Sequence, residues 1–419
     1  MNIIFRKIPI EKVLITLIMI TYFIPNFYAI DRIGNQWLFL SLISLLSFIY
    51  IIFNRNRFKS VRYLFLKKEI IFYSFFILWV MVSIFFSLNK IEALVTFNQY
   101  FTVFFCFLMM RILSFNIKNS DKYFLNLLLV LMIIETLLVI SPILNDISDK
   151  SLEFRSMRYI GAAANVNITA FSLIYKVPVL FYFLENSKKL LNKLLISSLL
   201  FLVIFIVSIL GTRGAFIGVG ICVLVFVFYV IVSNANFINK IKKTAWIFLP
   251  LILAVLVNIK LSSESDNNVI SRASTINIST NDGSVNQRLR FYNDAFNQFI
   301  KKPIFGVGIG NWKLESIDYD KNNINGFIVP YHAHNDFLQI LAESGILGLI
   351  SYLLFLFYST KVLFKKSLFD NHLNIFLLGS FAIFILDSLL NFPIARPISQ
   401  LFLIALFTLI SSYDRKSTE

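Results

Sequence analysis

Apolar runs of about twenty residues recur along the whole chain, and they leave few ways for it to fold. A helix needs roughly 20 consecutive apolar residues to cross the hydrocarbon core of a bilayer. Spanning segments of this length are helical because a helix satisfies its own backbone hydrogen bonds in lipid. About twelve such runs are recognisable, over residues 12–30, 35–53, 70–88, 93–113, 123–144, 163–184, 194–211, 214–233, 245–260, 339–364, 373–392 and 396–412. The sequence therefore predicts an all-α polytopic membrane protein with about twelve transmembrane helices.

Composition favours the same class. Of the 419 residues, 58% are hydrophobic and 15% are charged, which is more apolar surface than a soluble domain of this size can bury. The first run is long and lacks a small-residue cleavage site, so we expect it to remain as a helix and not to be a signal peptide. Cys106 and Cys222 lie inside predicted spans, where we expect small apolar fillers and not a zinc site or a disulfide framework.

The net charge of +16 is explained by membrane topology. If the N-terminus is cytoplasmic, more than half of the 39 lysines and arginines fall on the cytoplasmic side of the predicted spans. Short cytoplasmic loops of membrane proteins carry this excess of positive charge. We therefore expect both termini to be cytoplasmic, with membrane lipids and no nucleic acid as partners.

One long polar segment interrupts the pattern of short loops. We expect helices one to nine over residues 1–260, a large periplasmic loop over 261–336, and helices ten to twelve with a cytoplasmic tail over 337–419. Inside the loop, a Ser- and Asn-rich connector is expected over 262–286. An amphipathic helix lying along the outer interface follows from Gln287 until Pro303 stops it.

Three histidines are present, and two of them lie at the outer mouth of the tenth predicted helix. There, His332 and His334 can each act as a base, as a ligand or as a plain interfacial residue. His332, His334 and Asp336 alternate, so an extended segment would place them on one face, where a metal could bind. Because no fourth ligand is near, we expect no metal. His372 falls in a cytoplasmic loop, where a solvated surface position is expected.

Arginines outside the membrane are candidates for anion binding. Arg213 lies in GTRGAF, the turn between the seventh and eighth predicted spans. It either reaches to lipid headgroups or contacts a diphosphate with its planar, permanently charged fork. The same two interpretations apply to Arg288 and Arg290 on the amphipathic helix, namely a surface charge or a contact with an anion. The glycines of the IFGVGIGNW segment follow a helix stop, so a tight loop is expected there and not a nucleotide-binding loop.

Three charged residues fall inside predicted spans: Glu135, Lys176 and Asp387. Charges within a membrane are costly, and they are normally paired or functional. A structural ion pair between Lys176 and one or both acids is one interpretation, and a proton or substrate pathway is the other.

Several motifs together resemble the bacterial O-antigen ligase/polymerase superfamily. The run HAHNDFLQILAESGILGLI is similar to its histidine signature, in which His334-Asn335 is followed after nine residues by Gly345. QRLRFYNDAFNQFIKKPIFGVGIGNW resembles the preceding segment, and GTRGAF resembles the arginine turn, with Thr212 where serine is more usual. GAAANVNITA and NFPIARP also resemble family segments, so the likeness covers residues of about 160 to 400 in order.

This resemblance implies a GT-C-like helical fold and a glycan donor carried on undecaprenyl diphosphate. The donor would lie in the outer leaflet of the inner membrane, with its diphosphate held by arginines. The acceptor hydroxyl would attack the anomeric carbon with inversion, without a metal, a cofactor or a nucleotide sugar. His334 matches the motif histidine, Arg213 matches the turn arginine, and either Arg288 or Arg290 matches the loop arginine.

His332, Asn335 and Glu343 are candidates for a supporting role. Asn335 and Glu343 either orient His334 or serve only as helix-start and interfacial residues. Histidine can accept a hydroxyl proton near neutral pH, and arginine stabilises a leaving diphosphate without titrating.

Four functions remain open from the sequence. The His-Asn-x9-Gly spacing favours a ligase that transfers a glycan to a lipid A–core acceptor. A polymerase of lipid-linked repeat units shares the same donor and fold, and a protein O-oligosaccharyltransferase carries a similar histidine motif. A polytopic transporter or flippase is the alternative from another class, and it would need neither His334 nor the long loop.

Overall fold

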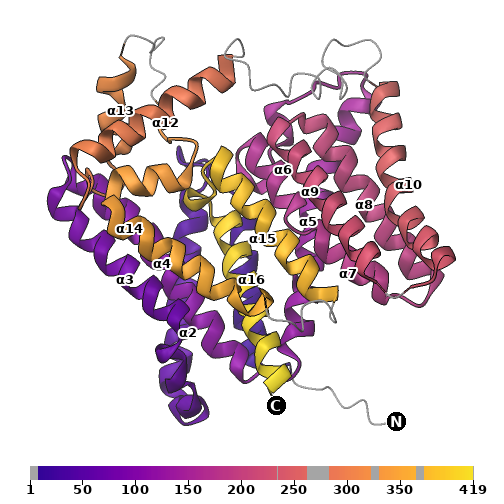
Figure 1. Cartoon of the computed structure of the whole chain (residues 1–419), viewed down its shortest axis with the longest axis horizontal. Coiled ribbons are helices and arrows are strands. Elements are labelled where there is room, and N and C mark those ends of the chain that lie inside the picture. The colour runs from indigo at the N-terminus through magenta and orange to yellow at the C-terminus, as the bar shows by residue number, and fades with distance from the viewer. Residues whose placement is uncertain (1–7, 234, 262–282, 322–329, 365–371, 419) are drawn as a thin grey trace.

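The structure, a computed structural model, describes residues 8–233, 235–261, 283–321, 330–364 and 372–418, and these residues form helices and no strand (Figure 1). The α-helices are α1 Ile10–Ile20, α2 Gly34–Phe53, α3 Lys68–Ser83, α4 Lys90–Phe115, α5 Ser120–Ser148, α6 Val166–Ile174, α7 Val177–Asn186, α8 Leu190–Leu210, α9 Arg213–Val232, α10 Phe237–Leu261, α12 Gly283–Lys301, α13 Trp312–Asp320, α14 Asp336–Thr360, α15 His372–Leu390 and α16 Pro397–Thr418. The all-α prediction is therefore confirmed over this part of the chain.

About twelve spans were predicted, and within the described residues 10 helices are long and apolar enough to cross a membrane. The two other predicted spans form shorter apolar helices, because α1 has 11 residues and the apolar part of α16 covers Pro397–Tyr413. The first run is interrupted before Pro25, since the residue before a proline is driven out of the helical region, and Ile24 is extended there.

The two helices of the long loop lie together at one end of the molecule, at the top of the view, and α16 finishes at the opposite end (Figure 1). α12 forms as an amphipathic helix, and its buried residues Phe291 and Ala295 pack against Trp312, Ala333 and Ala342. It therefore packs on α13 and on the start of α14, and does not lie only along the interface as expected. The predicted connector over 262–286 lies outside the described residues as far as residue 282.

The helix that carries the histidine motif is broken at Gly345. This residue has φ +70° and ψ −170° inside α14, a conformation that L-residues rarely adopt. A side chain is excluded as well, because a Cβ on Gly345 would lie 2.1 Å from the Ile304 carbonyl oxygen. The single continuous entry into the tenth span that the sequence suggested is thus two helical pieces joined at an angle.

The glycine-rich segment of the loop satisfies the backbone groups that this break leaves open. A helix end has carbonyl groups without intrahelical partners. Here, the Val307 amide donates to the Ala342 carbonyl (3.0 Å), and the Gly308 amide donates to the Glu343 carbonyl (2.9 Å). Gly306 must lack a side chain, because a Cβ would lie 2.3 Å from the Glu343 carbonyl carbon. The loop and the broken helix therefore form one structural unit, which holds the residues before α14 in place.

The buried charges form separate polar clusters. The Lys176 ammonium lies 2.8 Å from Glu135, which also accepts hydrogen bonds from Tyr22 Oη (2.6 Å) and Ser172 Oγ (2.7 Å). The predicted ion pair is thus present between these two residues. Asp387 instead accepts hydrogen bonds from Tyr175 Oη and Asn391 Nδ2. A buried pair satisfied in this way costs less than an isolated charge in lipid.

Candidate functional site

A cationic pocket of about 160 Å³ lies at the end of the molecule that carries the loop helices. Arg213, Arg288 and His334 all line it, although they come from different helices and from distant parts of the chain. Further lining residues are Arg155, Asn167, Thr212 and Asn391. The structure thus brings together the turn arginine, one loop arginine and the motif histidine. We call this the arginine pocket.

Arg213 is positioned by the tight turn between α8 and α9. Gly211 ends α8 in the left-handed conformation, and Thr212 is the N-cap of α9, so Arg213 is its first residue. The Thr212 hydroxyl donates to Asn167 Oδ1 (3.3 Å) and fixes the turn against α6. The first amide groups of a helix have no intrahelical partner and carry partial positive charge. Together with the guanidinium groups, this helix start favours a phosphate-like anion.

His334 is held in a strained conformation by a tyrosine of the loop helix. It has φ +55°, which is uncommon for a residue with a side chain. The Tyr292 hydroxyl lies within hydrogen-bonding distance of the His334 carbonyl (3.0 Å) and of the Leu389 carbonyl (2.7 Å). The imidazole is flanked by the rings of Phe291 and Phe392. α12 therefore sets the orientation of the histidine as well as supplying an arginine.

The environment keeps His334 neutral. Burial lowers its pKa to about 4, the nearby Arg288 charge adds to this effect, and a backbone hydrogen bond with Leu390 opposes it. An imidazole with such a pKa is unprotonated at pH 7, so it can accept a proton from a hydroxyl group.

His332 lies on the other side of the Phe392 ring and faces a different pocket. The two rings are stacked with centroids 4.2 Å apart, and Phe392 meets His334 edge-on at 5.2 Å. His332 lines a second pocket of about 410 Å³. Burial, followed by the charge of Arg396, lowers its pKa to about 3.

The alternating motif does not form one metal-binding face. His332 and His334 line different pockets, and Asp336 Oδ2 accepts a hydrogen bond from the Ile394 amide (3.0 Å). Among the described residues, no group of three or more His, Cys, Asp or Glu side chains is arranged to hold a metal. His372 is exposed and lies edge-on to Tyr229.

The structure gives contacts of their own to the other candidate residues. Asn335 caps α14, because its Oδ1 accepts a hydrogen bond from the Leu338 amide (3.1 Å). Glu343 lines the second pocket and accepts from the Trp312 amide (3.1 Å). Arg290 is not among the residues that line the arginine pocket, since helix positions two apart face different directions. The geometry therefore distinguishes the two loop arginines and favours Arg288.

Two asparagines of this site were not identified as candidates in the sequence. Asn167 Nδ2 lies 3.5 Å from Asn391 Oδ1, and Asn391 Nδ2 donates to Asp387 Oδ1 (2.6 Å). This polar chain connects the turn of Arg213 with α15. Asn167 and Asn391 lie in the family-like motifs GAAANVNITA and NFPIARP, which could have indicated them as candidates. Because the two motifs are more than two hundred residues apart, the sequence does not show that these asparagines lie close together.

These features define a class, namely a multi-pass helical membrane protein with a cationic pocket and a neutral imidazole at one end. Comparison with known proteins makes the class specific. Residues 198–353, which include Arg213, Arg288 and His334, match the family described as O-antigen ligase. This match confirms the resemblance seen in the motifs.

Two curated relatives have names that agree with this assignment. A Rickettsia conorii protein named "Putative polysaccharide ligase" is 26% identical over 293 residues, which cover 66% of this chain and 64% of that protein. A Rickettsia typhi protein of the same name is 24% identical over 339 residues, covering 75% of this chain and 74% of that protein. The alignment thus spans somewhat less than two thirds of the first relative.

Proposed function

We propose that this protein transfers a glycan from undecaprenyl diphosphate to an acceptor hydroxyl on the periplasmic side of the inner membrane, and that its reaction is O-antigen ligation to lipid A–core. The observation that carries the proposal is the meeting of Arg213, Arg288 and His334 in one pocket. Family membership and the names of the relatives support the same substrate class.

In the proposed reaction, the arginines and the histidine of the arginine pocket have different roles. Arg213, Arg288 and the start of α9 bind the diphosphate and stabilise the negative charge that develops as it leaves. His334 accepts the proton of the acceptor hydroxyl while its oxygen attacks the anomeric carbon from the opposite side. The bond from the sugar to the diphosphate breaks as the new glycosidic bond forms, which inverts the configuration. No metal, cofactor or nucleotide enters this reaction.

The proposal takes the shorter helices α1 and α16 to cross the bilayer together with the 10 longer ones. With both termini in the cytoplasm, as the charge distribution favours, the turn of Arg213 and the loop helices then lie outside, where the lipid-linked donor is displayed. Undecaprenyl diphosphate is a membrane lipid, so the donor reaches the pocket from the bilayer.

Arg288→Ala is expected to lower kcat/KM for glycan transfer roughly 10- to 100-fold, because a charge-assisted hydrogen bond to a phosphate is lost. Arg290→Ala, two residues further along the same helix, is the matched control and is expected to stay within about threefold of wild type. The measurement is transfer by purified protein in lipid nanodiscs. A larger loss in the Arg290 variant would reverse the assignment of the loop arginine.

A repeat-unit polymerase shares the donor and the pocket, so the surface glycan of a strain lacking this protein decides between the two reactions. Long chains that accumulate on undecaprenyl diphosphate, with a bare core, are expected for a ligase. Cores capped by single repeat units would indicate a polymerase. An acceptor protein that loses its glycan would indicate an O-oligosaccharyltransferase. Unchanged surface glycan and glycoprotein would contradict all three transferase functions and favour a transporter or flippase.

A further inference from the structure

The second pocket is larger than the arginine pocket and is separated from it by one aromatic ring. Its volume is about 410 Å³, which falls in the range of pockets that bind small organic ligands, roughly 300–1,000 Å³. Phe392 contacts His332 on the side of this pocket and His334 on the side of the arginine pocket. A ligand here therefore lies next to the proposed reaction centre.

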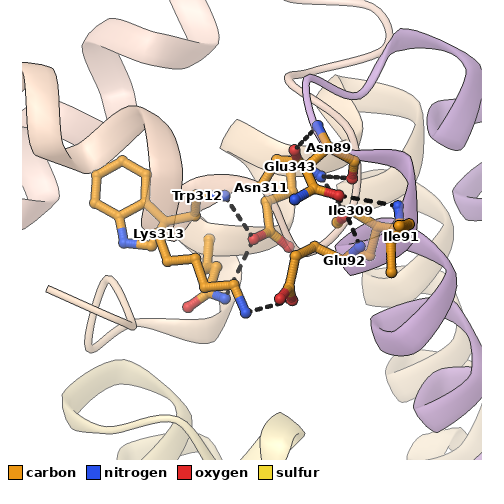
Figure 2. A network of polar contacts seen from close by, with 9 residues as sticks. Asn89, Ile91, Glu92, Ile309, Asn311, Trp312, Lys313 and Glu343 are labelled. Carbon is orange, nitrogen blue, oxygen red and sulfur yellow. Dashed lines mark hydrogen bonds and ion pairs between the residues drawn. The ribbon is translucent and has the colours of Figure 1, made fainter. Parts of the chain in front are cut away.

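The rim of this pocket is built by contacts between α13 and the start of α4. Figure 2 shows this network, in which the Asn89 amide donates to Asn311 Oδ1 (2.7 Å) and Asn311 Nδ2 donates back to the Asn89 carbonyl (3.2 Å). Two residues beyond Asn311 and three beyond Asn89, Lys313 forms an ion pair with Glu92. Asn311 is fully buried, so these contacts hold a fixed wall.

A row of planar polar side chains lines the interior. The Trp312 amide donates to Glu343 Oε1 (3.1 Å, Figure 2), and Gln339 Nε2 donates to the same oxygen (3.4 Å). Glu343 Oε2 and His332 Nδ1 are buried atoms that have no hydrogen-bond partner in the structure. Leaving such groups unpaired costs free energy. A ligand with several hydroxyl groups would satisfy them.

The two pockets differ in the charge of the residues that line them. Arg155, Arg213 and Arg288 line the arginine pocket, and none of the described residues around it is acidic. In contrast, Asp31, Glu92 and Glu343 all line the second pocket, together with two cations, Lys313 and Arg396. With three acidic side chains against two cations, this lining has no excess of positive charge to attract a diphosphate. The second pocket therefore suits an uncharged, hydrogen-bonding group.

We propose that the second pocket binds a neutral saccharide, namely the sugar unit of the acceptor. Carboxylates, amides and hydroxyls supply the donors and acceptors that pair with neighbouring sugar hydroxyls, and the pocket holds the acceptor beside His334 across Phe392. This inference rests on the proposed function for the source of the sugar. The donor's own sugar has the same chemistry, and the experiment distinguishes the two sources.

The test uses Glu343→Gln, which keeps an acceptor for the Trp312 amide but removes the charge, and Gln99→Ala, a lining residue from α4. The full-length protein in nanodiscs is assayed for transfer with donor and acceptor varied in turn. The KM for the acceptor is expected to rise about tenfold or more, and the KM for the donor and kcat are expected to stay within about twofold. Glu315→Gln, which changes a carboxylate of α13 outside this pocket, is the matched control and is expected to behave as wild type.

A second measurement separates this inference from the proposed function. Core oligosaccharide released from the host's lipopolysaccharide is titrated into the same protein, and equilibrium binding is measured without any donor. Saturable binding that weakens about tenfold in Glu343→Gln and Gln99→Ala would support the pocket even if no transfer were detected. Unchanged binding and unchanged kinetics in both variants would overturn the inference. A rise in the donor KM alone would assign the pocket to the donor's sugar and overturn the acceptor assignment.

Discussion

Arg213→Ala is expected to abolish glycan transfer in cells and to lower kcat/KM by roughly 100- to 1,000-fold in nanodiscs, the usual cost of removing a group that stabilises developing negative charge. The reason is geometric, because Arg213 starts α9 and lines the same pocket as Arg288 and His334. Arg213→Lys is expected to recover little, since an ammonium cannot make the two parallel contacts of a guanidinium.

The control for this result is Arg158→Ala. Arg158 also lies outside the spans, and its side chain is half exposed and paired with Asp146. Membrane insertion of both variants is expected to match wild type, as measured by protein level in the membrane fraction. Normal surface glycan in the Arg213→Ala strain would remove this arginine from the mechanism.

His334→Asn is expected to lower kcat for transfer by roughly 100- to 10,000-fold, the usual contribution of a positioned general base. Asparagine is the sharpest replacement, because it tolerates the left-handed conformation that His334 adopts and still forms hydrogen bonds, but it cannot accept a proton at neutral pH. His372→Asn changes the exposed histidine at the start of α15 and is expected to retain full activity. An active His334→Asn protein would show that the imidazole is not the base.

The pH dependence gives an independent check of the same residue. Because the pKa of His334 is lowered to about 4, kcat/KM should stay level as the pH falls from 7 to about 5 and decline only as the imidazole becomes protonated. Arg288→Gln removes the second cause of the lowered pKa but leaves the larger one, burial, so the acid limb should move upward yet remain below the ordinary histidine pKa of 6.5. An acid limb near pH 6.5 in the wild type would contradict the buried, neutral imidazole.

The transmembrane helices and the family were readable from the sequence because both depend on local patterns. Run length and hydrophobicity set where a helix can span. The two shortest of the predicted spans have local causes too, since Pro25 limits the helical run that contains α1 and the apolar part of α16 is short. In contrast, the angle within α14 depends on packing of Gly345 against Ile304, and no pattern within the histidine motif indicated it.

Short motifs of characteristic residue types, and their resemblance to a known family, indicated Arg213, Arg288 or Arg290, and His334 as the groups to consider. Only the tertiary structure decided which of them meet. Arg288 lines the pocket and Arg290 does not, because α12 packs through Phe291 and Ala295. His332 and His334 line different pockets, and Phe392, which follows α15, stacks on His332 and meets His334 edge-on. Such contacts join segments distant in the chain, so they arise from packing and cannot be read from order along the sequence.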